Sequence, residues 1–315
     1  MKKQIRILIS ILAFIIIIPL NASAQDSTAV ARDSTAVIDS SKINRKYFYK
    51  ALAYESAFYV GAMLVMQDTW YKNRALCPLH FDNDNSGYLQ MDKFGHAFGA
   101  YLESYIGYNW LRNSGMTKKQ ALIYGGTLGF ILQAPIEIMD GIHEGWGFSW
   151  GDLTANTVGS ALFIGQQLLF DEQLVKYKFS FWESEYADKA NGYLGTSTLQ
   201  NVLQDYNGHN YWFSIPINKI VPNKILPDWL CISLGYGANG MYGEYWNITE
   251  HKGVSIPQTT RYRQYLLSLD IDWTKIKTRS KFLKVVLQGL TFIKLPFPTL
   301  EYNSMGKFQG YWMYY

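Results

Sequence analysis

A change in hydrophobic period divides the chain and limits the folds open to it. From Tyr47 to about Val175 apolar residues recur at helical spacing, whereas after about residue 205 apolar and polar residues alternate. The first pattern predicts helices that bury one stripe, and the second predicts strands with one apolar face. The two patterns occupy separate stretches. We therefore expect an α+β fold, with a compact bundle of about four helices followed by a C-terminal antiparallel β-region of four to five strands.

Four apolar segments make up the expected bundle, at roughly 48–69, 93–112, 119–140 and 152–172. They carry small residues at or near four-residue spacing, which lets helix backbones approach closely. Polar residues interrupt the segments, and outside the N-terminus there is no clean apolar run of about 18 residues, so we predict that they are poor membrane spans. The interrupting residues are Glu55, Glu103, Gln133, Glu137, Asn156, Gln166 and Gln167.

The β-region shows the alternation in several stretches. In "RYRQYLLSLDIDW", Tyr265, Leu267 and Leu269 point one way, while Ser268 and Asp270 point the other. The stretches "YWFSIPI", "WLCISLGYGANG" and "PTLEYN" alternate in the same manner. Between the strands, "RSKFLKVVLQGLTFIKL" predicts one basic amphipathic helix. Two placements are open for it, a membrane interface or packing against the sheet.

The N-terminus has the pattern of an export signal. Three basic residues precede an apolar run from Ile7 to Ile18, and "ASA" at 22–24 is a cleavage site, so we predict a signal peptide over 1–24. An uncleaved anchor helix is the alternative. No cysteine follows the cleavage site, so this is not a lipoprotein signal. The repeated "DSTAV" predicts a disordered spacer over 25–46, followed by the helical bundle over 47–175 and the β-region over 176–315.

Composition bounds the partners. Charged residues make up 17% and aromatic residues 16%, a bias that fits a membrane interface. Removing the signal peptide lowers the formal net charge from +4 to +1, which leaves no electrostatic case for nucleic-acid binding. We expect an exported protein of the outer membrane or periplasm whose partners are membrane or outer-membrane components. The oligomeric state is open, as is the choice between two buried thiols and a bridge for Cys77 and Cys231.

Charged and polar side chains gather in three of the predicted helices. Asp92, His96 and Glu103 share one helical face, with Asp92 predicted as the N-cap. Ser149 and Asp152 predict a capping box for the fourth helix. The candidate polar cluster comprises Asp92, Lys93, His96, Glu103, Glu137, Asp140, His143, Glu144, Ser149, Asp152 and Asn156.

Two interpretations of this cluster are open. The acids and bases neutralise one another and fix how the helices dock, which is the interpretation we favour, or they form an acid–base or metal site. In the second case the candidate catalytic residues are Asp92, His96, Glu137 and Asp140. Residues 82–93 resemble a calcium-binding loop, but the position of the bidentate glutamate holds Lys93, so we predict neither a metal nor another cofactor. Whether the protein is an enzyme stays open.

The same residues carry a family resemblance. "MDKFGHAFGAY" followed by "PIEIMDGIHEGWGFSWGDLTANTVGS" resembles the DUF2279 family of uncharacterised, YfiM-like envelope proteins, and is distantly similar to VanZ-like membrane proteins. The resemblance covers about residues 90–170 and implies a compact helical unit in the envelope, without an established activity. We expect a structural or supportive protein at the outer membrane. The alternative is a membrane-proximal hydrolase that acts on lipid or glycan through the Asp/His/Glu cluster.

Overall fold

The computed structural model describes residues 43–221 and 226–315, so the predicted signal peptide and most of the predicted spacer lie outside the described residues. Long helices form the first half of this part: α2 (Arg45–Met66), α3 (Met91–Asn113), α5 (Leu128–Gly141) and α6 (Trp150–Leu169). Short turns of helix join or extend them: η2 (Gln67–Tyr71), η3 (Gly87–Gln90), α4 (Lys118–Gln120) and η4 (Ala121–Gly125).

Glycines allow α3 to lie against its neighbours. A Cβ atom added at Gly159 of α6 would lie 2.1 Å from the carbonyl oxygen of Ala97, and one at Gly129 of α5 would lie 1.9 Å from that of Ala100. Real Cβ atoms do not approach a backbone oxygen so closely. The small residues seen in the sequence therefore set the contacts of α3 with α5 and α6.

The second half is built on one antiparallel sheet with the strand order β10-β9-β8-β5-β4-β3. The predicted α+β class is confirmed, and the sheet has six strands rather than four or five. The additional strands are β3, which precedes the predicted start of the alternating region, and β10 at the C-terminus. The strands are β3 (Lys176–Phe181), β4 (His209–Pro216), β5 (Leu230–Asn239), β8 (Tyr262–Ile271), β9 (Phe297–Asn303) and β10 (Phe308–Tyr314).

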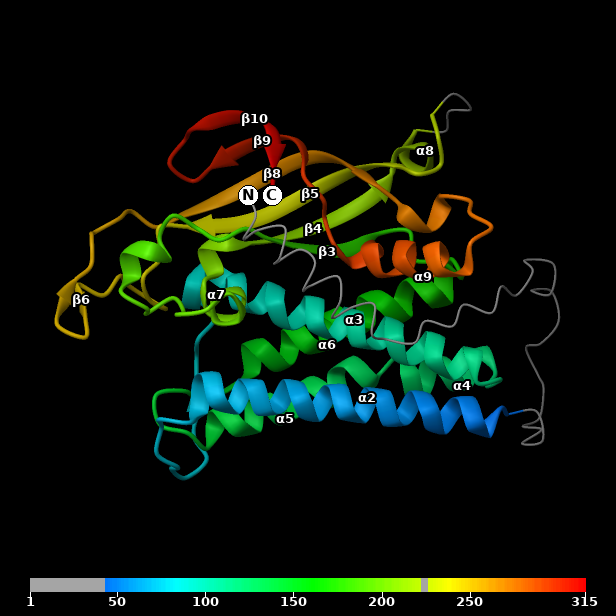
Figure 1. The fold of residues 1–315 in the computed structure, drawn as a ribbon, viewed down its shortest axis with the longest axis horizontal. Coiled ribbons are helices and arrows are strands. Elements are labelled where there is room, and N and C mark those ends of the chain that lie inside the picture. Colours follow the sequence, from blue (N-terminus) through cyan, green and yellow to red (C-terminus); the bar gives the residue numbers. More distant parts are fainter. Residues whose placement is uncertain (1–42, 222–225) are drawn as a thin grey trace.

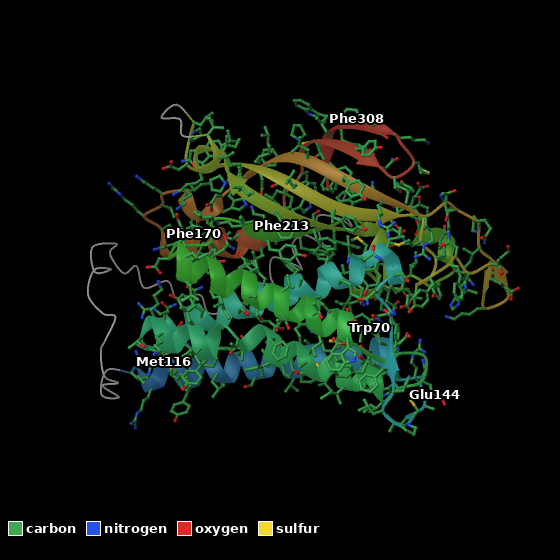
Figure 2. All side chains as sticks on the ribbon, turned by 180° about the vertical axis from the view of Figure 1, so that it is seen from behind. Trp70, Met116, Glu144, Phe170, Phe213 and Phe308 are labelled. Atoms are coloured by element: carbon green, nitrogen blue, oxygen red, sulfur yellow. The ribbon has the colours of Figure 1, made fainter. Side chains whose placement is uncertain are left out.

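Figure 1 shows the sheet lying over α3 and α6, with α2 and α5 on the far side of these two helices. Aromatic rings fill the contact between helix and sheet. Phe94 of α3 stacks on Tyr211 and Tyr236, and Phe98 contacts Tyr177 of β3. Figure 2 shows Phe213 between the sheet and the helices, and Phe308 on the far side of the sheet.

Short elements complete the fold. The predicted amphipathic helix is α9 (Lys281–Gly289), and Leu287 is buried while Phe282 is exposed. Cys77 and Cys231 are both free thiols, so the structure contains no bridge between them. The remaining elements are α7 (Thr198–Gln204), α8 (Ile217–Ile220), η5 (Asp188–Ala190), η6 (Tyr206–Gly208), η7 (Trp273–Lys275), η8 (Leu290–Phe292), the parallel pair β1 (Phe81–Asp82) and β2 (Phe148–Ser149), and the pair β6 (Glu250–His251) and β7 (Val254–Ser255).

Candidate functional site

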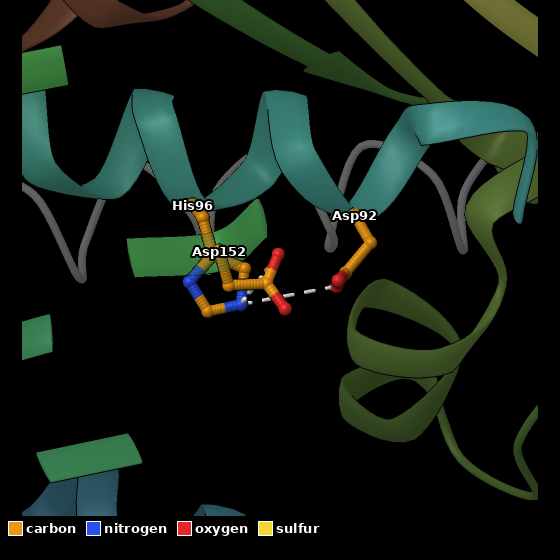
Figure 3. A group of neighbouring side chains, drawn as sticks. All are labelled: Asp92, His96 and Asp152. Atoms are coloured by element: carbon orange, nitrogen blue, oxygen red, sulfur yellow. Dashed lines mark ion pairs between the residues drawn. The ribbon is translucent and has the colours of Figure 1, made fainter. Parts of the chain in front are cut away.

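Three side chains converge where α3 and α6 begin. Asp92 and His96 stand one turn apart on α3, and Asp152 reaches them from the first turn of α6 (Figure 3). The Nε2 atom of His96 lies 3.9 Å from Asp92 Oδ1 and 4.0 Å from Asp152 Oδ1, and one ligand atom from each of the three residues lies within 4.8 Å of the others. We refer to Asp92, His96 and Asp152 as the acid–His cluster. Carboxylate and imidazole groups at this spacing could hold a divalent cation.

Lys93 supplies a positive charge to the cluster. Its Nζ atom lies 2.6 Å from Asp84 Oδ2, 2.7 Å from Asp152 Oδ1 and 3.3 Å from Asp92 Oδ2. The lysine side chain is 13% exposed, so these ion pairs are poorly screened by water. The ammonium group therefore links α3, α6 and the loop before α3.

The second ring nitrogen of His96 lies close to groups on α5 and α6. Its Nδ1 atom lies 3.2 Å from Asn156 Oδ1 and 3.4 Å from Glu137 Oε1. Glu137 and Asn156 are fully buried, and the Asn156 amide donates to Glu137 Oε1 at 3.5 Å. The structure thus brings together Asp92, Lys93, His96, Glu137, Asp152 and Asn156 from the predicted cluster.

The prediction that Asp92 caps α3 is wrong. The helix begins at Met91, and its N-cap is Gln90, which has a left-handed backbone at φ 69°. Asp92 lies in the first turn, where its Oδ1 accepts a hydrogen bond of 2.7 Å from the Tyr206 hydroxyl. The carboxylate is drawn away from the backbone because Tyr206 and Lys93 approach it from elsewhere in the fold.

Half of the predicted capping box is present at α6. The Ser149 hydroxyl accepts from the Asp152 backbone N–H at 3.1 Å and donates to Asp84 Oδ1 at 2.5 Å. The carboxylate of Asp152 turns instead toward Lys93, because an ion pair at 2.7 Å outweighs a bond back to the cap residue.

The remaining predicted cluster residues lie in other surroundings. Asp140 accepts a hydrogen bond of 2.7 Å from the Tyr71 hydroxyl. Glu103 accepts from Gln133 at 3.4 Å, further along α3. The His143 ring hydrogen-bonds the carbonyl of Met139, and Glu144 lies in an exposed loop.

The charges of the cluster shift its ionisation. Burial alone would lower the pKa of His96, but the carboxylates of Asp152, Asp92 and Glu137 raise it to about 9. Burial and repulsion from Asp92 raise the pKa of Asp152. Burial also acts to raise the pKa of Asp92, yet the charges of His96 and Lys93 hold it below its ordinary value. At neutral pH the cluster therefore holds an imidazolium beside an ionised Asp92.

The acid–His cluster lines a cavity of about 480 Å³. Aromatic rings and carboxylates make up much of its wall, and Arg74 is its one arginine or lysine among the described residues. The wall draws on both halves of the fold, since α2, α3, α5, α6 and the segments before β4 and after β5 all contribute. The aromatic and acidic lining residues are Trp70, Tyr71, Tyr88, Trp146, Tyr193, Tyr206, Tyr211, Asp82, Asp84, Asp92, Asp140, Asp152 and Glu244.

Several of these residues were not predicted as part of a site. Tyr71 and Tyr206 donate hydrogen bonds to Asp140 and Asp92 from segments 69 and 114 residues away in the chain. No local spacing connects such positions. Asp84 and Lys93 both belong to the calcium-like loop of residues 82–93. Their opposite charges within one short loop were a signal that they could pair.

Comparison with known proteins supports the envelope assignment. Residues 80–166 match the family described as "Predicted periplasmic lipoprotein (DUF2279)", so the predicted resemblance to DUF2279 is confirmed, and with it the location in the cell envelope. The matched segment contains α3, α5, α6 and the acid–His cluster. No curated protein and no solved structure matches the chain.

Proposed function

We propose that this envelope protein is a hydrolase of an uncharged glycan and that the acid–His cluster performs the reaction. The observation that carries the proposal is the position of the cluster in the wall of a 480 Å³ cavity. A cluster that only docks helices would be sealed between them, whereas a catalytic cluster needs room for water and substrate.

The protonation states suit acid–base hydrolysis. Asp92 is the ionised group and keeps His96 protonated. At 3.9 Å it lies too close to Nε2 to activate the water, so another carboxylate of the cavity wall acts as general base on a water molecule on the opposite face of the sugar ring. His96 is the protonated group and gives its Nε2 proton to the leaving oxygen, so that water is added across the bond. At 3.9 and 4.0 Å from the two carboxylates, Nε2 makes a hydrogen bond to neither, which leaves its proton available for a substrate atom.

The charge of the cavity favours a neutral substrate. Six acidic residues line it against Arg74 and His96 (Asp82, Asp84, Asp92, Asp140, Asp152 and Glu244). Burial and the charge of Asp92 raise the pKa of Asp152 to about 8, and the other five acids still outnumber the two cations. Such a wall repels phosphate groups and other anions, whereas carboxylates accept hydrogen bonds from hydroxyl groups. The aromatic rings add flat apolar surface for a sugar ring.

The test is hydrolysis of uncharged oligosaccharides labelled at the reducing end. Asp92→Asn and His96→Gln should each lower kcat by about 10²-fold or more, because His96→Gln removes the proton donor and Asp92→Asn removes a charge that keeps this donor protonated. Glu144→Gln, in an exposed loop outside the cluster, should match the natural protein. The proposal fails if both cluster variants keep full activity, or if the natural protein cleaves none of the oligosaccharides.

A structural or supportive role is the second candidate, and Lys93 favours it. Its ammonium group holds acids from α3, α6 and the preceding loop within 3.3 Å, which is the geometry of a docking contact. In that case the His96→Gln variant should lose stability together with any activity. A variant that melts like the natural protein but has lost hydrolysis favours catalysis.

A further inference from the structure

In this sheet the apolar side chains point outward and the polar side chains point inward, the reverse of a sheet that faces water. On β8 the apolar side chains of Tyr265, Leu267 and Leu269 are 46%, 39% and 43% exposed, while Ser268 and Asp270, which alternate with them, are buried. An antiparallel sheet at an aqueous surface places its polar residues outward. Strands that face lipid have the opposite alternation.

Ion pairs and hydrogen bonds within the protein hold most groups of the buried polar face. Lys178 Nζ lies 2.6 Å from Asp270 Oδ2, and both side chains are fully buried. Asp270 also accepts from the hydroxyls of Ser214 and Ser233. Because these groups find partners inside the fold, the apolar face is free to meet a nonpolar environment.

The apolar face of the sheet is covered by a helix at one strand and exposed at others. Cross-strand pairs connect Tyr236 to Tyr265 and Tyr265 to Tyr302, so these side chains share one face. At β5 this face packs on α3 through Phe94 and Tyr236. At β8 and β9 no described element covers it, and Leu300 and Tyr302 are 45% and 52% exposed.

The helices present the same kind of surface. Among the described residues, no charged side chain is exposed on α2 after Lys50, on η4, on α5 or on α6. The polar residues that interrupt these helices in the sequence, such as Glu137, Asn156 and Gln166, point inward and are buried. One helical segment in the described part, Lys118–Gly141, is long and apolar enough to cross a membrane, and 28% of its most apolar window is buried.

Threonine hydroxyls on these helices are withdrawn from solvent. Thr154 and Thr157, both exposed on α6, donate to the carbonyl oxygens of Trp150 and Leu153 at 2.7 and 2.8 Å. Thr127 bonds Ile123 in the same way at 2.6 Å. Each hydroxyl therefore has a partner four residues back in its own helix, as in helices that face lipid.

Dimensions and charge agree with immersion in a bilayer. The 16 residues of α2 after Lys50 span roughly 24 Å at 1.5 Å each, which fits within the ~30 Å hydrocarbon core. Basic residues gather at the end of the molecule where α2 begins and α4, α8 and α9 lie (Figure 1). Three of them have acidic partners there, since Lys118 pairs with Asp171 and both Lys219 and Lys275 pair with Glu172. Anionic headgroups complement this end. The basic residues are Arg45, Lys46, Lys50, Arg112, Lys118, Lys119, Lys219, Lys275, Lys277, Arg279 and Lys284.

We propose that these surfaces form a lipid-facing belt that contacts the acyl chains of an envelope bilayer. The belt comprises the outward sides of α2 after Lys50, η4, α5 and α6, and the exposed apolar face of β8 and β9. It lies on both the helix side and the sheet side of the molecule (Figure 1), so the protein is immersed in the bilayer rather than resting on it by one side. The acid–His cluster lies at the end of the bundle where α3 and α6 begin.

The first test measures what surrounds single positions. Ile131→Cys on the helix side, Leu267→Cys on the sheet side and Glu144→Cys in the end loop are spin-labelled after Cys77→Ser and Cys231→Ala. The full chain is then placed in vesicles of phosphatidylethanolamine and phosphatidylglycerol. The spin relaxation of lipid-facing labels should be accelerated by oxygen, which concentrates in hydrocarbon. A water-soluble nickel complex should leave their relaxation nearly unchanged. The label at residue 144 should show the reverse.

Each other outcome contradicts the proposal. If the nickel complex reaches the labels at residues 131 and 267 as readily as the label at residue 144, the belt faces water. Protection from both reagents means that a second copy or another protein covers the belt.

A second test leaves the cysteines in place. Ile131→Lys lies in the belt, and Leu76→Lys lies in the loop before α3, and both replace exposed apolar side chains. In a bilayer Ile131→Lys should lower the membrane-inserted fraction that survives alkaline carbonate washing by about tenfold, and Leu76→Lys should not. Equal recovery of both variants overturns the proposal. Activity toward oligosaccharides enters neither test, so the belt and the proposed hydrolase can fail separately.

Discussion

At the residue scale, Lys93 decides whether the acids of the site can remain charged. Its ammonium group lies within 3.3 Å of Asp84, Asp92 and Asp152, and its side chain is 13% exposed. Three carboxylates held this close repel one another, and little water reaches them to screen the repulsion. The cation therefore stabilises the arrangement that brings α6 to α3.

We expect Lys93→Met to lower the free energy of unfolding by about 3–5 kcal/mol at neutral pH, because it leaves buried acids without their partner. The loss should shrink in acid, where the carboxylates take up protons. Lys72→Met is the matched control, since Lys72 pairs with Asp68 at 2.7 Å but both side chains are more than 60% exposed. Urea unfolding measures both variants, and equal stability losses would contradict the argument.

The raised pKa of His96 predicts a pH dependence of stability. The group titrates at about 9 in the folded protein and near 6.5 when unfolded. A raised folded pKa means that the contribution to stability is complete below about pH 6.5 and is lost as pH rises through about 9. Unfolding of the natural protein should therefore become easier between pH 7 and pH 9.5. His96→Gln should flatten this change, and an unaltered slope would show that another group titrates.

At the element scale, glycine fixes the spacing of the bundle. Gly159 of α6 faces the backbone of α3. At Gly165, six residues further along the same helix, an added Cβ atom would have no neighbouring atom within 4 Å outside its own stretch of helix. The two positions are alike in their helix and in the size of the change that alanine makes. They differ in what the added methyl group meets.

Gly159→Ala should destabilise the protein by about 1–3 kcal/mol, because the methyl group must push α3 and α6 apart. Gly165→Ala should be neutral or slightly stabilising, because alanine favours the helix. Thermal unfolding of the two variants checks this. If both behave alike, the close approach at Gly159 is not what sets the distance between the helices.

Elements were more predictable from the sequence than the contacts between them. The helical period located α3, α5 and α6, and alternation located β4, β5, β8 and β9. Strand β3 was missed because its polar alternate residues, Lys176 and Lys178, face the buried side of the sheet, where they pair with Asp272 and Asp270. Local spacing placed Asp92 with His96, but only the folded chain brings Tyr206 to Asp92.

At the whole-molecule scale, the predicted domain boundary near Val175 crosses a shared core. Phe94, Phe98 and Tyr101 of α3 pack on rings from β3, β4 and β5. The cavity wall is also shared, since Tyr206 reaches Asp92 from beyond the boundary. The helical bundle and the sheet therefore each cover apolar surface that the other would leave open.

We expect a chain ended at Val175 to lack an independently stable bundle, because the aromatic face of α3 loses its cover and Asp92 loses the Tyr206 hydroxyl. In detergent, such a fragment should be digested by protease at concentrations that leave the full chain intact. Supplying residues 176–315 as a second chain should restore resistance, since it returns the same rings to α3 without the covalent link. A fragment that alone resists protease as well as the full chain would show that the bundle is a separate domain, and that the aromatic contact adds little to its stability.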